Sequence, residues 1–132
     1  MANLAVNSTM VPGSAEKNKL IGWLVSYEID PKGKPFEIRV GRTLITSEKP
    51  PHNDSILLQS PDISAPHLAI KASSDHKLFI QDIFSNNGSF LVKSGTNNEV
   101  PVTTTTEVSH GDLIKIGKST KFKVCLIDDP NR

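Results

Sequence analysis

The fold class that the sequence predicts is an all-β sandwich of about ten to eleven strands with no substantial helix. Short β-prone runs follow one another closely, turn-forming residues separate these runs, and no apolar pattern of helical period extends over a useful length. A chain of 132 residues also has the size of one domain. It is long enough to bury a core without a metal or a disulfide framework.

The predicted strands are short runs rich in β-branched, aliphatic and aromatic residues. They cover residues 22–29, 36–40, 43–46, 55–58, 68–72, 77–83, 89–92, 100–102, 113–116 and 122–127. Gly, Pro, Asn and Asp occupy the connections, as in segments 30–33 and 85–88, because these residues fit tight turns. The threonine run 103–106 is interpreted as a β-prone connection into the next strand.

The domain organisation follows from composition. Residues 1–19 are rich in Asn, Ser, Gly and Lys without a sustained period, so we predict a flexible N-terminal tail there. The folded domain is expected over residues 20–127, and residues 128–132 are expected to be a C-terminal tail or linker.

Charge and hydropathy narrow the functional classes. Fifteen basic and fourteen acidic residues give a net charge of +1, which argues against nucleic acid as a partner. No stretch approaches ~18 apolar residues and no signal-peptide pattern begins the chain, so we expect no membrane partner and a cytoplasmic location. The single Cys125 lies in an alternating apolar run and is expected to be a buried, inert thiol, which suits a reducing compartment.

Three segments carry a resemblance to one family. Residues 62–70 (DISAPHLAI) place a serine three positions before a histidine that precedes an apolar strand, and residues 82–91 (DIFSNNGSFL) fit Asp-x-x-Ser-x-Asn-Gly-Thr-aromatic with Ser89 in place of Thr. Residues 108–117 (VSHGDLIKIG) supply a later Gly-Asp and an aliphatic strand. In this order and spacing, the three segments resemble the forkhead-associated (FHA) domain, and the resemblance covers about residues 23–127.

This resemblance implies an FHA/SMAD-like sandwich and a non-catalytic signalling module that binds phosphothreonine peptides. A phosphate monoester carries about −1.5 to −2 charges and several strong acceptors, which hydroxyl, amide and cationic groups satisfy. By resemblance, Ser64 would donate its hydroxyl to the phosphate, while His67 would fix the loop that carries Ser64. Asn87 would bond the main chain of the peptide, Gly88 would permit the turn, and Asn86 would flank the pocket.

One departure from the family pattern concerns the arginine that contacts the phosphate. A literal match to the family's Gly-Arg pair places it at Arg42, but that match leaves a long stretch before Ser64. We favour the alternative, in which Thr46 and Ser47 stand where the pair belongs and Ser47 replaces the arginine. Lys49 or Arg42 is a candidate substitute for the missing charge.

The departure leaves two binding functions open. A hydrogen bond to a charged group contributes about 1.5–3 kcal/mol, so loss of the arginine predicts binding roughly tenfold to a hundredfold weaker. Residues 65 and 66, Ala and Pro, also stand where relatives carry a basic or amide residue. The alternative function is therefore a phosphate-independent interaction or self-association domain, the regulatory part of a larger signalling protein.

An enzyme, a metal site and a cofactor are not expected. Ser64, His67 and Asp82 suggest a triad, but no Gly-x-Ser-x-Gly elbow exists, and Ser64 and His67 are too close in an extended loop to pair as nucleophile and base. The four histidines show no ligand spacing.

The N-terminal tail offers one possible partner for the domain. Thr9 is a lone threonine in a segment that we predict to be accessible to a kinase. Phosphorylated Thr9 could occupy the phosphate site of its own chain, where tethering would compensate for weak affinity.

Overall fold

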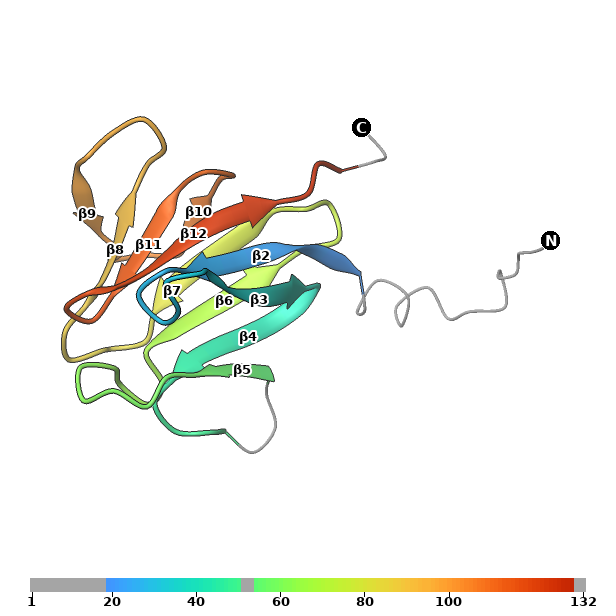
Figure 1. Ribbon diagram of the computed structural model, residues 1–132. Coiled ribbons are helices and arrows are strands. Elements are labelled where there is room, and N and C mark those ends of the chain that lie inside the picture. The colour runs from blue at the N-terminus through green and yellow to red at the C-terminus, as the bar shows by residue number, and fades with distance from the viewer. Residues whose placement is uncertain (1–18, 51–53, 130–132) are drawn as a thin grey trace.

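The computed structural model describes residues 19–50 and 54–129, and these form eleven strands and no helix (Figure 1). No helix in this part of the chain is therefore available to cross a membrane. The strands are β2 (Leu20–Ser26), β3 (Lys34–Arg39), β4 (Gly41–Thr46), β5 (Asp54–Leu57), β6 (Leu68–Ala72), β7 (Leu78–Asp82), β8 (Ser89–Val92), β9 (Glu99–Pro101), β10 (Thr106–Val108), β11 (Leu113–Ile116) and β12 (Thr120–Leu126).

The strands form two sheets packed face to face. One has five strands in the order β10-β7-β6-β4-β5, and the other has six in the order β3-β2-β12-β11-β8-β9. All pairs are antiparallel except β4 with β5, which run parallel. The architecture confirms the predicted all-β sandwich.

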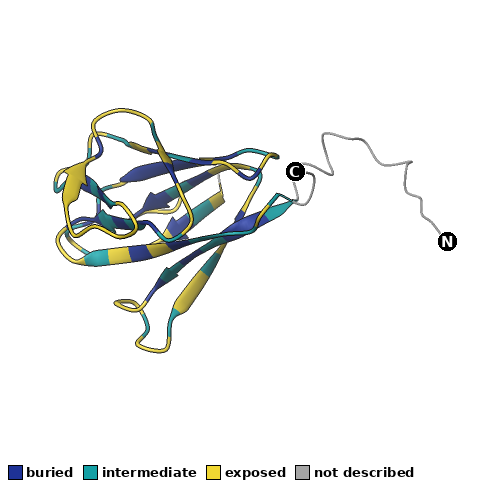
Figure 2. Ribbon diagram, turned by 90° about the horizontal axis from the view of Figure 1, so that it is seen from above, coloured by how far each residue is buried: buried dark blue, intermediate teal, exposed yellow. Residues whose placement is uncertain are grey.

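The core lies between the sheets because alternate residues of each strand point inward. Leu24, Ile45, Ile80, Ile114 and Phe122 are fully buried and come from both sheets. Figure 2 shows the same division, with buried segments along the strands and exposed segments in the connections. This packing fixes the ends of the strands. The connections at those ends carry the predicted binding residues, such as Ser64 and Asn87.

Two details differ from the sequence-based expectations. A short strand, β10, continues directly from the threonine run and pairs with β7, where only a connection was expected. Cys125 is only partly buried, so the expectation of a buried thiol was wrong. The alternation of β12 turns its neighbour Val124 into the core and leaves Cys125 on the outer face.

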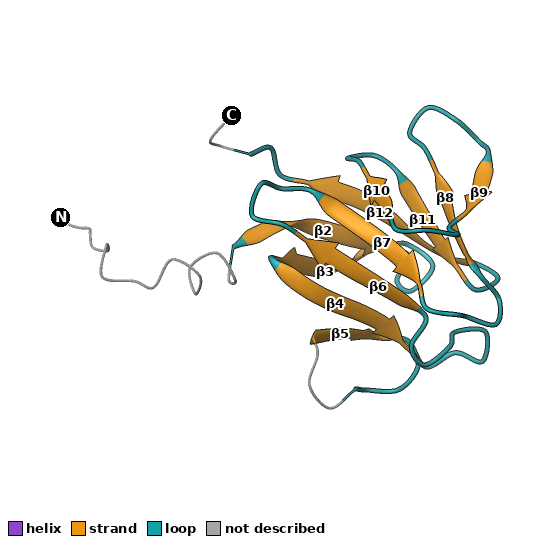
Figure 3. Cartoon of the chain, turned by 180° about the vertical axis from the view of Figure 1, so that it is seen from behind, coloured by secondary structure: helices purple, strands orange, loops and turns teal. Residues whose placement is uncertain are grey.

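Four connections meet at one end of the sandwich. Ser47, at the end of β4, donates its backbone N–H to the Ser64 carbonyl, and Ile83 donates to the His67 carbonyl. Gly117 donates to the Gly88 carbonyl. We call this end, made of Ser47 and of residues 58–67, 83–88 and 117–119, the Ser64 end. Strand β2 begins and β12 finishes at the opposite end (Figures 1 and 3).

Candidate functional site

The loop that carries Ser64 joins β5 to β6 and is held from both sides. Ile63 is buried and anchors the loop in the core, and its N–H donates to the Ser60 carbonyl. Ser64 itself is partly exposed, and its Oγ accepts a hydrogen bond of 3.0 Å from the backbone N–H of Asn86. Because this bond uses the hydroxyl oxygen as acceptor, the hydroxyl hydrogen remains able to donate to a ligand.

The His67 side chain links this loop to the next one. His67 is fully buried, its Nδ1 lies 3.0 Å from the Ser64 backbone N, and its Nε2 lies 2.8 Å from the Gly88 carbonyl oxygen. An amide N–H donates only to an unprotonated nitrogen, so these partners assign the proton to Nε2. One neutral imidazole therefore bridges the main chains on both sides of the site.

The second loop, residues 83–88, joins β7 to β8 and is fixed by the Asp82 carboxylate. This carboxylate accepts hydrogen bonds from the Ser85 N–H at 3.1 Å, the Ser85 hydroxyl at 2.5 Å and the Ser89 hydroxyl at 2.6 Å. Burial raises the pKa of Asp82, but the hydrogen bonds from Ser85 and Ser89 outweigh it and hold that pKa below its ordinary value. Gly88 closes the loop with a φ of 83°, a conformation that favours glycine.

The two asparagines of this loop differ in their surroundings. Asn86 is exposed, while the Nδ2 of Asn87 donates to the Asp62 carbonyl at 3.0 Å. That bond orients the Asn87 amide and leaves its other N–H and its Oδ1 for further partners. Asn87 also lines a hollow of about 320 Å³ together with Pro61, Asp62, Lys118 and Ser119.

Lys118 is a candidate site residue that the sequence patterns did not indicate. It is exposed in the β11–β12 turn, and its backbone N–H donates to the Asp62 carboxylate at 2.7 Å. The hydrogen bond from Ser60 and then that from the Lys118 N–H lower the pKa of Asp62. The sequence signal was weak, since Lys118 merely follows the last glycine of the third motif. The fold adds this cation to the rim of the hollow.

Ser47 and Lys49 are two of the candidates for the position of the family's phosphate-contacting arginine, and both lie in the connection that follows β4. Ser47 is adjacent to Ser64, because its N–H donates to the Ser64 carbonyl at 3.1 Å. Thr46 Oγ1 bonds the main chain of Glu48, at 2.9 Å to its carbonyl and 3.2 Å to its N–H, which folds the chain just after β4. Lys49 follows as an exposed residue of the same connection.

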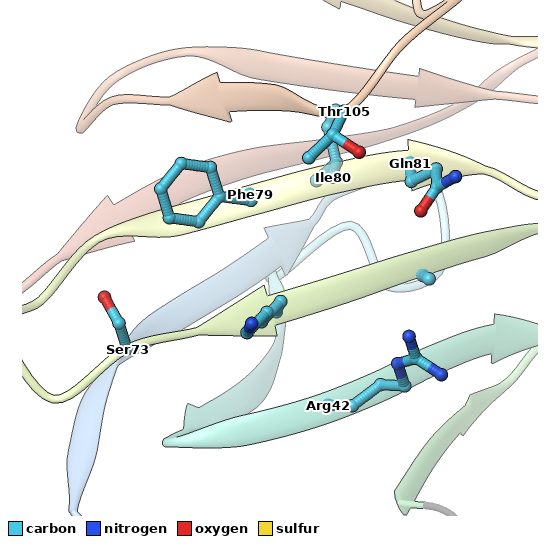
Figure 4. Close-up of a pocket in the computed structure, with 8 residues that line it drawn as sticks. Arg42, Ser73, Phe79, Ile80, Gln81 and Thr105 are labelled. Carbon is cyan, nitrogen blue, oxygen red and sulfur yellow. The ribbon is translucent and has the colours of Figure 1, made fainter.

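Arg42 lies apart from the Ser64 end. It pairs with Lys71 in register, whereas Ile45, three residues later on β4, pairs with Leu68 at the start of β6. At about 3.3 Å per residue, Arg42 sits roughly 10 Å further along the strand. Figure 4 shows it on the outer face of the five-stranded sheet, together with Phe79 and Gln81. These residues line a hollow of about 480 Å³.

The structure thus brings together most of the residues that the sequence suggested. Arg42 is the exception. The residues gathered at the Ser64 end are Ser47, Ser64, His67, Asn86, Asn87 and Gly88, with Lys49 on the connection that leaves this end.

The chemistry of this arrangement is that of recognition. The His67 imidazole bonds the main-chain N–H of Ser64, so it is not placed as a base for the Ser64 hydroxyl. Among residues 19–50 and 54–129, no group of three or more His, Cys, Asp or Glu side chains could hold a metal ion. A hydroxyl donor, an oriented amide and nearby lysines instead form a surface suited to an anionic group.

Comparison with known proteins agrees with this geometry. The family model described as the FHA domain matches residues 38–117, more than half of the chain. No curated protein matches the sequence.

Solved structures with the same fold come from distant organisms. The FHA domain of a hypothetical protein from Arabidopsis thaliana has a TM-score of 0.66 and 23% identity, with 85% of this chain and 90% of that chain covered. The FHA domain of the CT664 protein from Chlamydia trachomatis has a TM-score of 0.63 and 20% identity, covering 83% and 99%. The FHA domain of human APLF, solved with an XRCC1 bisphospho peptide, has a TM-score of 0.61 and 19% identity, covering 80% and 99%.

We predict that the fold depends on His67 more than on Ser64. His67→Ala removes the partner of the Ser64 N–H and one of the two partners of the Gly88 carbonyl, so it should lower the free energy of unfolding by about 1–3 kcal/mol. Ser64→Ala leaves the exposed Asn86 N–H to bond water, so it should change stability by no more than about 0.5 kcal/mol. Denaturant titration of both variants measures the difference, and equal midpoints would contradict this assignment of His67.

The Asp82 carboxylate predicts a specific pH dependence of stability. Since folding lowers its pKa below the ordinary 3.8, the carboxylate stabilises the fold fully at neutral pH, and this contribution is lost as pH falls below that value. Asp82→Asn should therefore be less stable than the wild type at pH 7, with a difference that shrinks in acid. Denaturant titrations at several pH values between 3 and 7 test this, and a constant difference would contradict it.

Proposed function

Because the chain belongs to the FHA domain family, we propose that it is a non-catalytic signalling module that binds phosphothreonine peptides through its Ser64 end. The observation that carries the proposal is the bridge that His67 makes between two loops, one of which carries the Ser64 hydroxyl and the other the Asn87 amide. Two solved relatives support it. One structure concerns phosphothreonine-dependent FHA domain interactions, and the APLF domain was solved with a bisphospho peptide.

In the proposed complex, the phosphate lies over Ser64 and the peptide runs past Asn87. The Ser64 hydroxyl donates to a phosphate oxygen, and the free N–H and Oδ1 of Asn87 bond the peptide main chain. Asn86 flanks the phosphate, while His67 and Gly88 support the site without touching the ligand. The hollow beside Asn87 provides the space that an extended peptide needs.

In our proposal, lysines supply the positive charge that attracts the phosphate. Ser47 occupies the position adjacent to Ser64 and carries no charge, which makes the phosphate site degenerate. Lys118, on the rim of the hollow, and Lys49, after Ser47, are the cations that we assign to long-range attraction of the phosphate. We assign no phosphate contact to Arg42. It lies about 10 Å along β4 from Ile45, the residue that pairs with Leu68 near the Ser64 end.

We further propose that the module serves a regulatory role in the cytoplasm. The alternative function is phosphate-independent interaction or self-association through the same loops. We favour the phosphate-dependent function, because the Ser64 hydroxyl hydrogen has no acceptor of its own among the described residues.

A matched pair of peptides tests the proposal. Wild-type protein should bind phosphothreonine peptides selected from a library at least tenfold more tightly than their unphosphorylated counterparts, and Ser64→Ala should remove most of that preference. Isothermal titration calorimetry measures both. Equal affinity for the two peptides would favour the phosphate-independent alternative.

Restoring the missing arginine should strengthen binding. Ser47→Arg places a guanidinium beside Ser64, and a hydrogen bond to a charged group contributes about 1.5–3 kcal/mol, so affinity for the phosphopeptide should rise roughly tenfold to a hundredfold. Thr46 is left unchanged because its hydroxyl bonds the main chain of Glu48.

Ser109→Arg is the matched control for Ser47→Arg. It adds the same charge in the exposed loop before β11, at the end of the sandwich opposite Ser64. An equal gain in both variants would show general electrostatic attraction instead of a specific contact. No gain in a folded Ser47→Arg variant would argue against Ser47 as the arginine position.

The N-terminal tail is a candidate ligand for this site. Thr9 lies outside the described residues, and the domain begins with β2 at the end opposite Ser64. Eleven residues from Thr9 to Leu20 span at most about 36–40 Å, and the seven residues of β2 account for about 23 Å of the return path. The segment between Thr9 and Leu20 is thus long enough for phosphorylated Thr9 to reach the Ser64 end of its own domain.

NMR of the protein with phosphorylated Thr9 tests this self-binding. Tethering gives an effective concentration near the millimolar range for a short linker, so we expect shifts of the Ser64 and Asn87 amides that do not depend on protein concentration. Concentration-dependent shifts would indicate binding between copies of the chain. Unchanged spectra would exclude self-binding in either form.

A further inference from the structure

Phe84 is the most exposed large apolar side chain in the described part of the protein. It is 99% exposed, whereas the next in order, Tyr27, is 62% exposed. Single exposed apolar residues are common on protein surfaces, but an aromatic ring without any covering contact is unusual, because burial of such a ring is strongly favourable. Exposure alone does not indicate a function, but the backbone conformation of Phe84 is unusual as well.

The Phe84 backbone is held in an unfavourable conformation. Its φ is 49°, in the left-handed region that bulky side chains rarely adopt. Among the described residues, only His76 shares a positive φ without being glycine. A residue in this region costs free energy relative to glycine, and such residues persist where the surrounding structure fixes them and where ligands bind.

The neighbours of Phe84 explain how it is held. Ile83, just before it, donates its N–H to the His67 carbonyl at 3.0 Å. Ser85, just after it, bonds the Asp82 carboxylate through both its N–H and its hydroxyl. The Phe84 backbone is therefore fixed on both sides while its ring remains in water. The loop fixes the position of an apolar side chain before any ligand binds.

This position is next to the proposed phosphate site. Asn86, two residues after Phe84, bonds the Ser64 Oγ, and Asn87 follows directly. Two residues span at most about 7 Å, so the ring is anchored within a short distance of the Ser64 hydroxyl. A peptide that crosses Ser64 and Asn87 in an extended conformation advances about 3.3 Å per residue. One of its side chains near the phosphothreonine thus falls within reach of the Phe84 ring.

From this geometry we infer that Phe84 is a specificity-determining residue, which selects ligands carrying an aliphatic or aromatic side chain close to the phosphothreonine. The inference rests on the proposed function. Burial of the ring against such a side chain removes apolar surface from water, and the pre-positioned loop avoids an ordering cost on binding. It also provides a source of affinity that does not need the missing arginine.

One substitution of Phe84 should raise the stability of the protein and lower its affinity for ligands. Phe84→Gly relieves the backbone conformation and removes the ring, so its melting temperature should rise by a few degrees. The same variant should bind its ligands at least fivefold more weakly. A residue that merely shapes the loop would not combine these two changes.

The probe is an array of peptides with a central phosphothreonine and degenerate flanking positions, paired with the same array carrying threonine. Wild-type protein should show enrichment of apolar side chains at one or two flanking positions. Phe84→Gly should lose this enrichment and keep its dependence on phosphate. Val100→Ala, which truncates an exposed apolar residue on β9, is the matched control and should behave as the wild type does.

Two results would overturn the inference, and they are distinguishable. If Phe84→Gly keeps both the phosphate dependence and the apolar enrichment, Phe84 does not contact the ligand, while the proposed function stands. If wild-type protein does not distinguish the phosphorylated array from the unphosphorylated one, the proposed function is wrong, and the inference that rests on it is wrong as well.

Discussion

The buried His67 imidazole is the interaction on which the Ser64 end depends. Its two nitrogens bond main-chain groups of Ser64 and Gly88, which are 24 positions apart in the chain and belong to different loops. No sheet pairing joins these loops directly. The ring therefore joins the two loops from within the core, and bonds from Asn86 to Ser64 Oγ and from Asn87 to the Asp62 carbonyl add to it. A neutral imidazole performs this role, since one nitrogen must accept while the other donates.

Carboxylates complete the support of the loops. Asp82 holds segment 83–88, and Asp62 bonds the Lys118 N–H across the hollow. Asp112, nearly fully buried at the other end of the sandwich, accepts the N–H groups of Ser94 and Ser109. Each carboxylate takes the place of main-chain acceptors that a loop lacks. Polar loops are thus as firmly specified as the strands, and a rigid surface loses less entropy when a ligand binds.

Sequence patterns predicted the fold well because the strands alternate clearly. Runs 68–72, 89–92 and 113–116 coincide with β6, β8 and β11. Strand β10 was missed because a run of threonines gives no alternation of apolar and polar residues, and its pairing with β7 is a tertiary effect. The exposure of Cys125 was missed because an apolar run does not by itself say which face of the strand points inward.

The site was predictable only where a motif names a residue. Ser64 bonds the N–H of Asn86 from the other loop, and Asn87 bonds the Asp62 carbonyl, a contact that no pattern indicates. Lys118 lies in the turn between the consecutive strands β11 and β12, and its backbone bond to the distant Asp62 places it at the hollow. Phe84 occupies an unspecified position of its motif, so neither its exposure nor its backbone conformation could be read from the sequence.

The most direct test of the account is an amide NMR titration with a phosphothreonine peptide. The signals of Ser47, Ser64 and residues 86–88 should shift together, because one ligand covers both loops joined by His67. The signals of Arg42 and Lys71 on the outer sheet face should remain in place. Shifts confined to Arg42 and Lys71, or no shifts at the Ser64 end at saturating peptide, would contradict the account.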